Sequence, residues 1–329
     1  MQTTFLTVQN LLAPCGCACR HCLLCSGGTA RGVAYERGAA LAWRLHEALP
    51  ALPMCYSCGD CYDYPEIAQN IALNKSLGFA GAGFLQLNGI RPRGPEEMLS
   101  WLQSLKDAGA ESADITFYGL RDFHDAFAGR PGDFDLMLCV LRTALALCLK
   151  THVTFPALEE NKSELEPLLH LLEQEGCAKF YGCLPDFRGR GMGLEASRLT
   201  RESLAALPDC VRGHLNLARY RAEQDWLREG FIPAQNRQLR LALTEQNIAQ
   251  WESLPPAQII AELEALDDDY YAALPDLNAL AVLYGDPEGT RLYRARDLGW
   301  KWRRQYRREH GIDNYDVTRE YDSGSLRQE

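Results

Sequence analysis

The sequence predicts an α/β fold, a partial (β/α)6 TIM-like barrel followed by a helical C-terminal subdomain. Two observations predict it. Segments with strand and helix patterns alternate through six strands over about residues 1–195, with mostly short connections. Beyond about residue 200 the alternation stops, and segments with helical spacing follow one another. We therefore expect a core at residues 1–195, a helical C-terminal subdomain at 196–315 and a polar tail at 316–329.

Each element is predicted from its local pattern. The strands are short apolar or alternating segments, at residues 4–12, 52–56, 83–90, 112–118, 151–157 and 179–184. The helices between them carry apolar residues at helical spacing, at residues 35–48, 65–77, 95–108, 134–149 and 161–175. Further helices are predicted at residues 201–207, 214–229, 244–253, 256–271, 276–284 and 290–310. Such alternation predicts parallel strands with right-handed crossovers and active groups at the C-terminal ends of the strands.

Composition and charge narrow the classes of function. The chain is 47% hydrophobic and 24% charged, which is typical of a soluble globular protein. Its formal net charge of −10 disfavours a nucleic-acid partner, and the basic aromatic run at residues 300–308 is interpreted as a helix with solvated arginines. The longest apolar run, residues 136–149, is too short to span a membrane, so no membrane partner is expected. Thirteen cysteines without a secretion signal predict metal binding in the reducing cytoplasm rather than disulfides.

One loop, at residues 14–28, is far richer in cysteine than packing requires. Five cysteines lie within eleven residues: Cys15, Cys17, Cys19, Cys22 and Cys25. Zinc sites usually pair C-x2-C hooks that a dozen or more residues separate, whereas these hooks overlap. A C-x3-C-x2-C pattern runs through Cys15, Cys19 and Cys22, and three thiolates suit an iron–sulfur cluster with one open iron. The triad of Cys19, Cys22 and Cys25 and a structural zinc site remain as alternatives.

Further motifs follow in a definite order. The segment after the second strand contains Cys58, Gly59, Asp60 and Cys61, and the third strand ends in a Leu87–Asn88–Gly89 turn. The fourth strand continues into a run that contains residues 115–119 (ITFYG), His124, Asp125 and residues 129–135 (GRPGDFD). With the cysteine motif, these segments resemble the radical S-adenosylmethionine (SAM) enzymes over about residues 1–195, in particular the peptide- and protein-modifying maturases.

The resemblance implies cofactors, partners and site residues. Cys15, Cys19 and Cys22 would hold a [4Fe–4S] cluster, while Gly59, Asp60 and Thr116 would contact SAM. Enzymes of this family cleave SAM reductively to a 5′-deoxyadenosyl radical, which takes a hydrogen atom from the substrate. The branch implies a peptide or protein substrate and a low-potential electron donor such as flavodoxin or ferredoxin. No residue is assigned a catalytic role beyond cofactor binding.

The sequence departs from the family at several positions. Asp60 stands where the family has Glu, Thr116 replaces Ser, Tyr118 replaces Asp, and His21 occupies the place of an aromatic residue. No cysteine follows Cys210, which excludes the two C-terminal auxiliary clusters of that branch.

The sequence leaves open the role of a second group of cysteines and the choice between the proposed function and two rivals. The second group is Cys55, Cys58 and Cys61, which could bind a second cluster or quench a substrate radical. We favour the interpretation that they are small residues that fill a crowded turn. His124 and Asp125 are predicted to be structural. The rival functions are a radical SAM enzyme that acts on a small molecule or RNA base, and a non-catalytic metal-binding adaptor on the same scaffold.

Overall fold

A computed structural model describes residues 2–13, 15–22, 32–59, 62–232 and 236–312 of the chain. The first part alternates strands and helices: β1 (Gln2–Ala13), α1 (Tyr35–Ala48), β2 (Met54–Gly59), α2 (Ile67–Ser76), β3 (Phe84–Gln86), α3 (Pro95–Asp107), β4 (Ser112–Thr116), α4 (Arg121–Ala128), α5 (Asp133–Ala146), β5 (Lys150–Pro156), α6 (Leu165–Gln174) and β6 (Phe180–Cys183). The second part contains η1 (Gly189–Ser197), α7 (Arg201–Ala205), α8 (Asp209–Arg212), η2 (Leu217–Arg219), β7 (Arg221–Ala222), α9 (Glu223–Glu229), β8 (Asn236–Ala242), α10 (Ile248–Ser253), α11 (Pro256–Ala272), α12 (Leu277–Tyr284), β9 (Leu292–Tyr293) and α13 (Ala295–Glu309).

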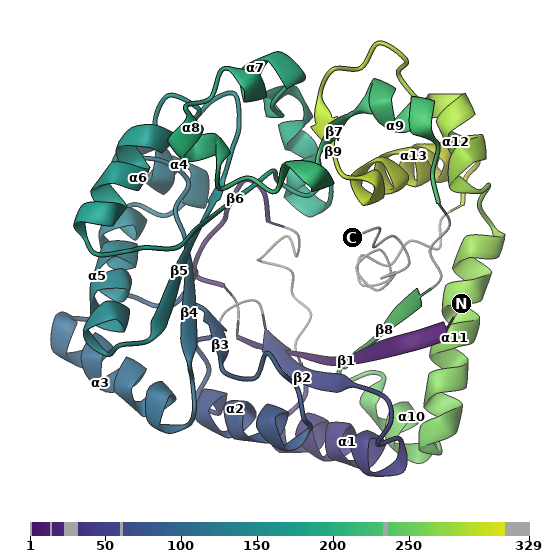
Figure 1. Cartoon of the computed structure of the whole chain (residues 1–329). Helices are drawn as coiled ribbons and strands as arrows, with labels where there is room; N and C mark the ends of the chain where they lie inside the picture. The colour runs from purple at the N-terminus through teal and green to yellow at the C-terminus, as the bar shows by residue number, and fades with distance from the viewer. Residues whose placement is uncertain (1, 14, 23–31, 60–61, 233–235, 313–329) are drawn as a thin grey trace.

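Two parallel sheets curve around a common centre, with helices α1, α2, α3, α5 and α6 on their outer side (Figure 1). Their strand orders are β2-β1-β8 and β3-β4-β5-β6, and every pair within them is parallel. The predicted α/β class with parallel strands is therefore confirmed. No helix in the described ranges has the length and apolar character that a membrane crossing requires.

The alternation of side chains along β1 places its apolar residues in the core between sheet and helices. On β1, Leu6 and Val8 are buried in the hydrophobic core, whereas Phe5, Thr7 and Gln9 line a cavity on the inner side. This two-residue period is the one expected of a strand with two different faces. The inner side of the arc is consequently lined by polar and aromatic residues and is available to a ligand.

The two sheets separate between β2 and β3, where side chains replace a neighbouring strand. Asn74 of α2 accepts a hydrogen bond from the Tyr56 backbone N–H at 2.8 Å and donates one to its carbonyl oxygen at 2.8 Å. Asn70 donates to the same carbonyl at 3.2 Å. Because a buried backbone group needs a partner, these amides satisfy the edge of β2 that β3 does not reach.

The second part of the chain differs from the expectation of successive helices. Residues 236–242 form β8, which pairs with β1 from Gln2 to Gln9, because buried Arg237, Leu239 and Leu241 alternate along it. The predicted helix at 214–229 is helical as α9 only from Glu223 onward, after η2 and β7. The division into residues 1–195, 196–315 and 316–329 stays a prediction.

One helix within residues 1–195 was not predicted. Helix α4 lies in the segment between the fourth strand and helix α5, where the sequence suggested a loop that holds His124 and Asp125. It ends at Gly129, whose φ of 65° is a conformation that glycine adopts readily.

Candidate functional site

The cysteine loop begins where β1 ends, beside the end of β2. The register of the two strands pairs Ala13 with Gly59, the residue predicted to contact SAM. The loop then approaches the turn after β3, because the Gly16 N–H donates to the Gly89 carbonyl at 2.7 Å. A Cβ atom on Gly16 would lie 2.8 Å from that carbonyl oxygen, so only glycine permits this approach.

Two further contacts tie the loop to segments that follow other strands. The Ala18 N–H donates to the Ala128 carbonyl of α4 at 2.8 Å. The Arg190 N–H, from the segment after β6, donates to the Cys22 carbonyl at 3.0 Å. The cysteine loop thus lies across the C-terminal ends of strands from both sheets, which is where parallel α/β folds place their active groups.

The thiols of the loop gather in one place. The cluster contains Cys15, Cys17, Cys19 and Cys22, packed with Tyr118, Phe127 and Leu194. The Cys17 backbone N–H donates to Cys15 Sγ at 3.5 Å. The Tyr118 hydroxyl donates to Cys19 Sγ at 3.2 Å. Hydrogen bonding by the Cys17 thiol, together with that by Tyr118, lowers the pKa of Cys19 despite its burial. Cys19 therefore loses its proton more readily than an ordinary thiol, and the thiolate is the form that binds metals.

This donor set suits an iron–sulfur cluster. Soft sulfur ligands crowded on one loop, one of them with a lowered pKa, are the donors that such clusters use. No group of three His, Cys, Asp or Glu side chains in the described part of the chain is already arranged around a single metal position. The ligand set of Cys15, Cys19 and Cys22 stays a prediction, and Cys25 lies outside the described residues.

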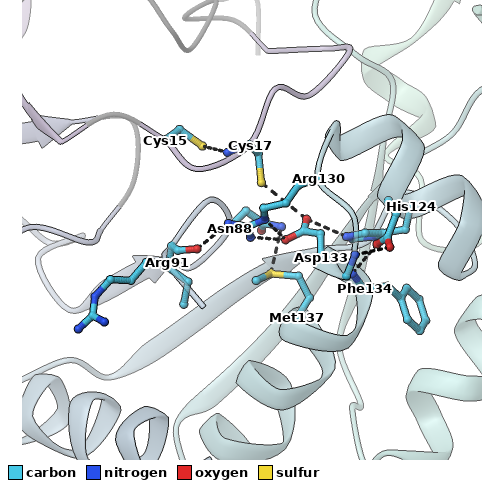
Figure 2. A network of polar contacts seen from close by, with 12 residues as sticks. Cys15, Cys17, Asn88, Arg91, His124, Arg130, Asp133, Phe134 and Met137 are labelled. Carbon is cyan, nitrogen blue, oxygen red and sulfur yellow. Dashed lines mark hydrogen bonds and ion pairs between the residues drawn. The ribbon is translucent and has the colours of Figure 1, made fainter. Parts of the chain in front are cut away.

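A buried carboxylate supports the loop from below, as Figure 2 shows. Asp133 lies 3.0 Å from His124 Nε2 and 2.9 Å from Arg130 Nε, and its Oδ2 is 3.7 Å from Cys17 Sγ. The Tyr118 backbone N–H donates to His124 Nδ1 at 3.2 Å, so His124 donates to Asp133 through Nε2. Burial raises the pKa of Asp133, but the hydrogen bonds from His124 and Arg130 outweigh it and hold that pKa below its usual value.

The same network shows what His124 and Asp125 do. His124 is completely buried, and its ring bridges the end of β4 to helix α5. Asp125 accepts from the backbone N–H groups of Gly132 at 2.6 Å and Phe134 at 2.8 Å, at the start of α5. Both residues are structural, as predicted, although they lie on α4 and not on a loop.

The predicted SAM contacts lie at strand ends. Gly59 ends β2 with a φ of 145°, and Thr116 ends β4. Asn88, from the turn after β3, accepts from the Thr116 N–H at 2.6 Å and donates to its carbonyl at 2.9 Å. Asp60 lies outside the described residues. The SAM-binding roles of Gly59, Asp60 and Thr116 stay predictions.

The structure explains two positions at which the sequence departs from the family that it resembles. The ring of His21 packs against Tyr118 at 5.2 Å and Phe127 at 5.5 Å between centroids, so it fills an aromatic position. Burial, with the nearby charge of Arg190, lowers the pKa of His21 to about 4 and keeps the ring neutral. Tyr118 stands where the family has Asp, and its hydroxyl donates a hydrogen bond to Cys19 Sγ.

Sequence reasoning missed the supporting role of Arg130 and Asp133. Both belong to the GRPGDFD run that carries the resemblance, and their spacing of three permits an ion pair. Arg130 also donates to the Ile90 carbonyl at 2.7 Å, which joins it to the segment after β3. Only the fold reveals that the pair faces the cysteine loop.

The second group of cysteines is only partly described. Burial raises the pKa of Cys55, and it raises that of Cys58 to about 12, so both are held as neutral thiols. Cys61 lies outside the described residues. A neutral, buried thiol is a small apolar residue in this context, which agrees with the preferred interpretation of this turn.

Comparison with known proteins adds a limited set of similarities. No family model matches the chain. Over 85 residues it is 32% identical to the pre-heme d1 synthase of Dinoroseobacter shibae, a match that covers 26% of this chain and 21% of that protein. The chain therefore spans about a fifth of the length of this curated relative.

Two solved structures show limited similarity to parts of this chain. Streptococcus suis SuiB bound to S-adenosylmethionine is 10% identical with a TM-score of 0.47, over 73% of this chain and 50% of that one. Escherichia coli coproporphyrinogen III oxidase (HemN), described as a radical SAM enzyme, is 12% identical with a TM-score of 0.44, over 74% of this chain and 64% of that one.

Proposed function

We propose that this chain is a radical SAM enzyme, whose cysteine loop holds a [4Fe–4S] cluster and whose substrate lies inside the arc of strands. The cysteine motif and the segments that follow it resemble those of the radical SAM enzymes. One observation carries the proposal: a C-x3-C-x2-C loop lies across the C-terminal ends of the parallel strands and is bonded to the segments after β3 and β6. Active groups of this class of fold lie at that position.

Three loop cysteines are the proposed cluster ligands, namely Cys15, Cys19 and Cys22. The remaining described cysteine of the loop is Cys17, whose Sγ lies 3.7 Å from Asp133 Oδ2. This neighbouring negative charge disfavours a Cys17 thiolate. A [4Fe–4S] cluster held by these three cysteines would supply the electron for the reductive cleavage of SAM.

The protein's own residues position the loop and exclude water. Asp133, at the start of α5, and Arg130, just before that helix, support it, and the Tyr118 hydroxyl stabilises negative charge on Cys19. Phe127 and Leu194 pack over the thiols, and this apolar cover protects a reactive radical from solvent. Gly59, Asp60 and Thr116 are the proposed SAM contacts.

The proposed architecture is a partial (β/α)6 TIM-like barrel with a C-terminal subdomain. The alternation of β1 to β6 with outer helices supports it (Figure 1). Strand β8 extends the barrel beyond β1 and brings the second part of the chain to its inner side.

The preferred substrate is a peptide or protein, with flavodoxin or ferredoxin as electron donor. The maturase-like run through His124, Asp125 and residues 129–135 supports this class. A small-molecule substrate is the second candidate, because the curated relative is named for the synthesis of a pre-heme. Addition of a precursor peptide or of a tetrapyrrole to the assay below distinguishes them, since the true substrate increases 5′-deoxyadenosine formation.

Anaerobic reconstitution with iron and sulfide, followed by dithionite and SAM, tests the function. We expect 5′-deoxyadenosine from the wild type and from Cys210→Ala, whose cysteine is exposed and far along the chain, and none from Cys22→Ala. Formation at the same rate by Cys22→Ala, or none by the wild type, would overturn the proposal. Zinc without sulfide in the purified protein would favour a metal-binding adaptor.

A further inference from the structure

A cavity of about 220 Å³ lies between η1, with the segment before it, and the second half of helix α13. Figure 1 shows α13 beside β9 and α12, in the second part of the chain. The described residues that line the cavity belong neither to the cysteine loop nor to the proposed SAM contacts. Its volume lies below the range of sites for drug-sized ligands, so it suits a single charged group with a small body.

The α13 side of this cavity is strongly positive. Lys301, Arg304 and Arg308 follow one another at spacings of three and four residues, so they lie on one face of the helix. Like charges at that spacing destabilise a helix. The helix dipole favours a cation in the last turn, where Arg308 lies, but Lys301 and Arg304 come earlier. The cluster therefore requires compensation by negative charge from outside the helix.

Lys301 receives that compensation within the chain. Its ammonium lies 2.7 Å from a carboxylate oxygen of Glu195 and 3.2 Å from one of Glu223. Glu195 is the one carboxylate among the described residues that line the cavity, and it also accepts from the Tyr293 hydroxyl at 2.9 Å. Burial raises the pKa of Glu195, but Lys301 and Tyr293 outweigh it and hold that pKa below its usual value. Glu195 is therefore ionised and already engaged.

Arg304 and Arg308 do not receive it. In the part of the chain that the structure describes, no carboxylate lies within ion-pair distance of either guanidinium, and both side chains are exposed. Arg304 contacts the thioether sulfur of Met192, which carries no charge. Arg308 lowers the pKa of the adjacent Glu309, but the larger cause is the Tyr284 hydroxyl, to which that carboxylate is bonded. Two guanidinium groups one helical turn apart are thus available to an anion.

We propose that this cavity binds a phosphate group, free or as the monoester of a small molecule, with Arg304 and Arg308 as the residues that recognise it. A phosphate monoester carries a charge of about −1.5 to −2 at pH 7 and three acceptor oxygens. Two guanidinium forks match that charge and geometry better than they match a singly charged anion. Phe187, which is buried, and Met192 also line the cavity and offer an apolar wall to the body of an ester. The site is separate from the proposed cluster, so it does not depend on radical chemistry.

Isothermal titration calorimetry in a phosphate-free buffer tests the site with three probes. Phenyl phosphate carries a ring and a phosphate, benzenesulfonate carries a ring and a single negative charge, and inorganic phosphate has no ring. Each is titrated into the full chain, into Arg304→Gln and Arg308→Gln, and into the control Arg228→Gln, whose side chain is 74% exposed. We expect each of the first two variants to weaken phenyl phosphate by about tenfold, since a charged hydrogen bond is lost, and Arg228→Gln to leave it unchanged. Benzenesulfonate should bind the wild type at least about tenfold more weakly than phenyl phosphate.

Three results would overturn the proposal. They are no binding of phenyl phosphate to the wild type at millimolar concentration, equal affinities for phenyl phosphate and benzenesulfonate, and an affinity for phenyl phosphate that neither arginine variant changes. Inorganic phosphate that binds as tightly as phenyl phosphate would identify the free anion as the ligand, and weaker binding would identify an ester.

A second variant tests the same cavity without removing a cation. Gln305→Glu keeps both arginines and adds a carboxylate to the lining, so it should also weaken phenyl phosphate. Unchanged binding would place the probe elsewhere and reject the site. Circular dichroism spectra that match the wild type verify that the variants are folded, as the exposure of Arg304 and Arg308 leads us to expect.

Discussion

At the scale of single residues, buried carboxyl groups behave in opposite ways according to their partners. Asp133 is 1% exposed and stays ionised because His124 and Arg130 donate to it. Asp114 of β4 is also buried, but a neutral hydroxyl donates to it, Thr154 Oγ1 at 2.8 Å. Burial therefore raises the pKa of Asp114 to about 6. The first residue holds the site together, whereas the second opposes stability at neutral pH.

Substitution of Asp133 by Asn tests the support of the cysteine loop. We expect a loss of about 3 kcal/mol in the free energy of unfolding, because the partly buried Arg130 would lose its ionic partner. Urea denaturation measures it. Asp135→Asn, two residues away, removes a carboxylate that is 58% exposed and pairs with Arg121, and should cost less than about 1 kcal/mol. Equal losses in the two variants would contradict the role given to Asp133.

The pKa of Asp114 predicts a pH-dependent stability. In the unfolded chain this carboxyl has its ordinary pKa of 3.8, so the folded state, at about 6, holds the proton more tightly. The cost of ionising it in the folded state is absent below about pH 4 and grows as the pH rises to about 6. Asp114→Asn removes that cost, and relative to wild type it should gain up to about 3 kcal/mol between pH 4 and pH 7.

Urea unfolding of wild type and Asp114→Asn at both pH values measures this gain. The asparagine keeps an oxygen that can accept from Thr154, so the hydrogen bond is not the variable. A stability difference that does not change between pH 4 and pH 7 would show that the folded-state pKa is not raised.

At the scale of elements, the break between the two sheets depends on side chains of α2. Short apolar or alternating segments predicted β1 to β6, and apolar residues at helical spacing predicted α1 at residues 35–48. The same reasoning extended β3 to residue 90, whereas the strand ends at Gln86 and the turn through Asn88 follows. No sequence pattern shows that Asn74 replaces a strand, because this depends on how β2 and β3 diverge.

Asn74→Ala tests whether the Asn74 side chain satisfies the edge of β2 that β3 does not reach. The change leaves the Tyr56 N–H without its partner, and we expect a loss of about 3 kcal/mol in stability, measured by chemical denaturation. Ser76→Ala on the same helix removes an exposed hydroxyl that bonds only to Ala72 and should cost less than about 0.5 kcal/mol. A loss at Asn74 no larger than that at Ser76 would mean that solvent satisfies this edge.

At the scale of the whole molecule, β8 connects the two parts of the chain. It pairs with β1, and Arg237 on it makes ion pairs with Asp267 and Asp268 of α11. The pattern of residues 236–242 is short and carries two arginines, so the sequence analysis predicted no element there, between the helices predicted at residues 214–229 and 244–253. A buried arginine becomes acceptable in a strand only when its carboxylate partners are placed by the fold.

Leu241→Ala tests whether the molecule unfolds as a unit. Leu241 of β8 is 1% exposed in the core, and its truncation should cost about 3 kcal/mol and lower the midpoint of one transition seen by both circular dichroism and tryptophan fluorescence. Leu217→Ala, at a residue 41% exposed, should change little. Two transitions, of which the variant moves only one, would instead indicate an independent C-terminal subdomain.

The candidate site was predicted in part. The spacing of Cys15, Cys19 and Cys22 and the strand before them predicted a loop at the strand ends, because parallel strands bring their C-terminal ends to one edge. The contacts of Tyr118 with Cys19, and of Asp133 with Cys17, join residues about a hundred positions apart. Local patterns carry no information on such pairs.

The central claim is that three cysteines of the loop hold a cluster that leaves one iron open to SAM. The electron paramagnetic resonance spectrum of the reconstituted, dithionite-reduced protein, recorded before and after SAM is added, tests it most directly. We expect a reduced [4Fe–4S] signal that SAM shifts in wild type and in Cys17→Ala, and no such signal in Cys15→Ala, Cys19→Ala or Cys22→Ala. A cluster signal that SAM leaves unchanged would contradict it.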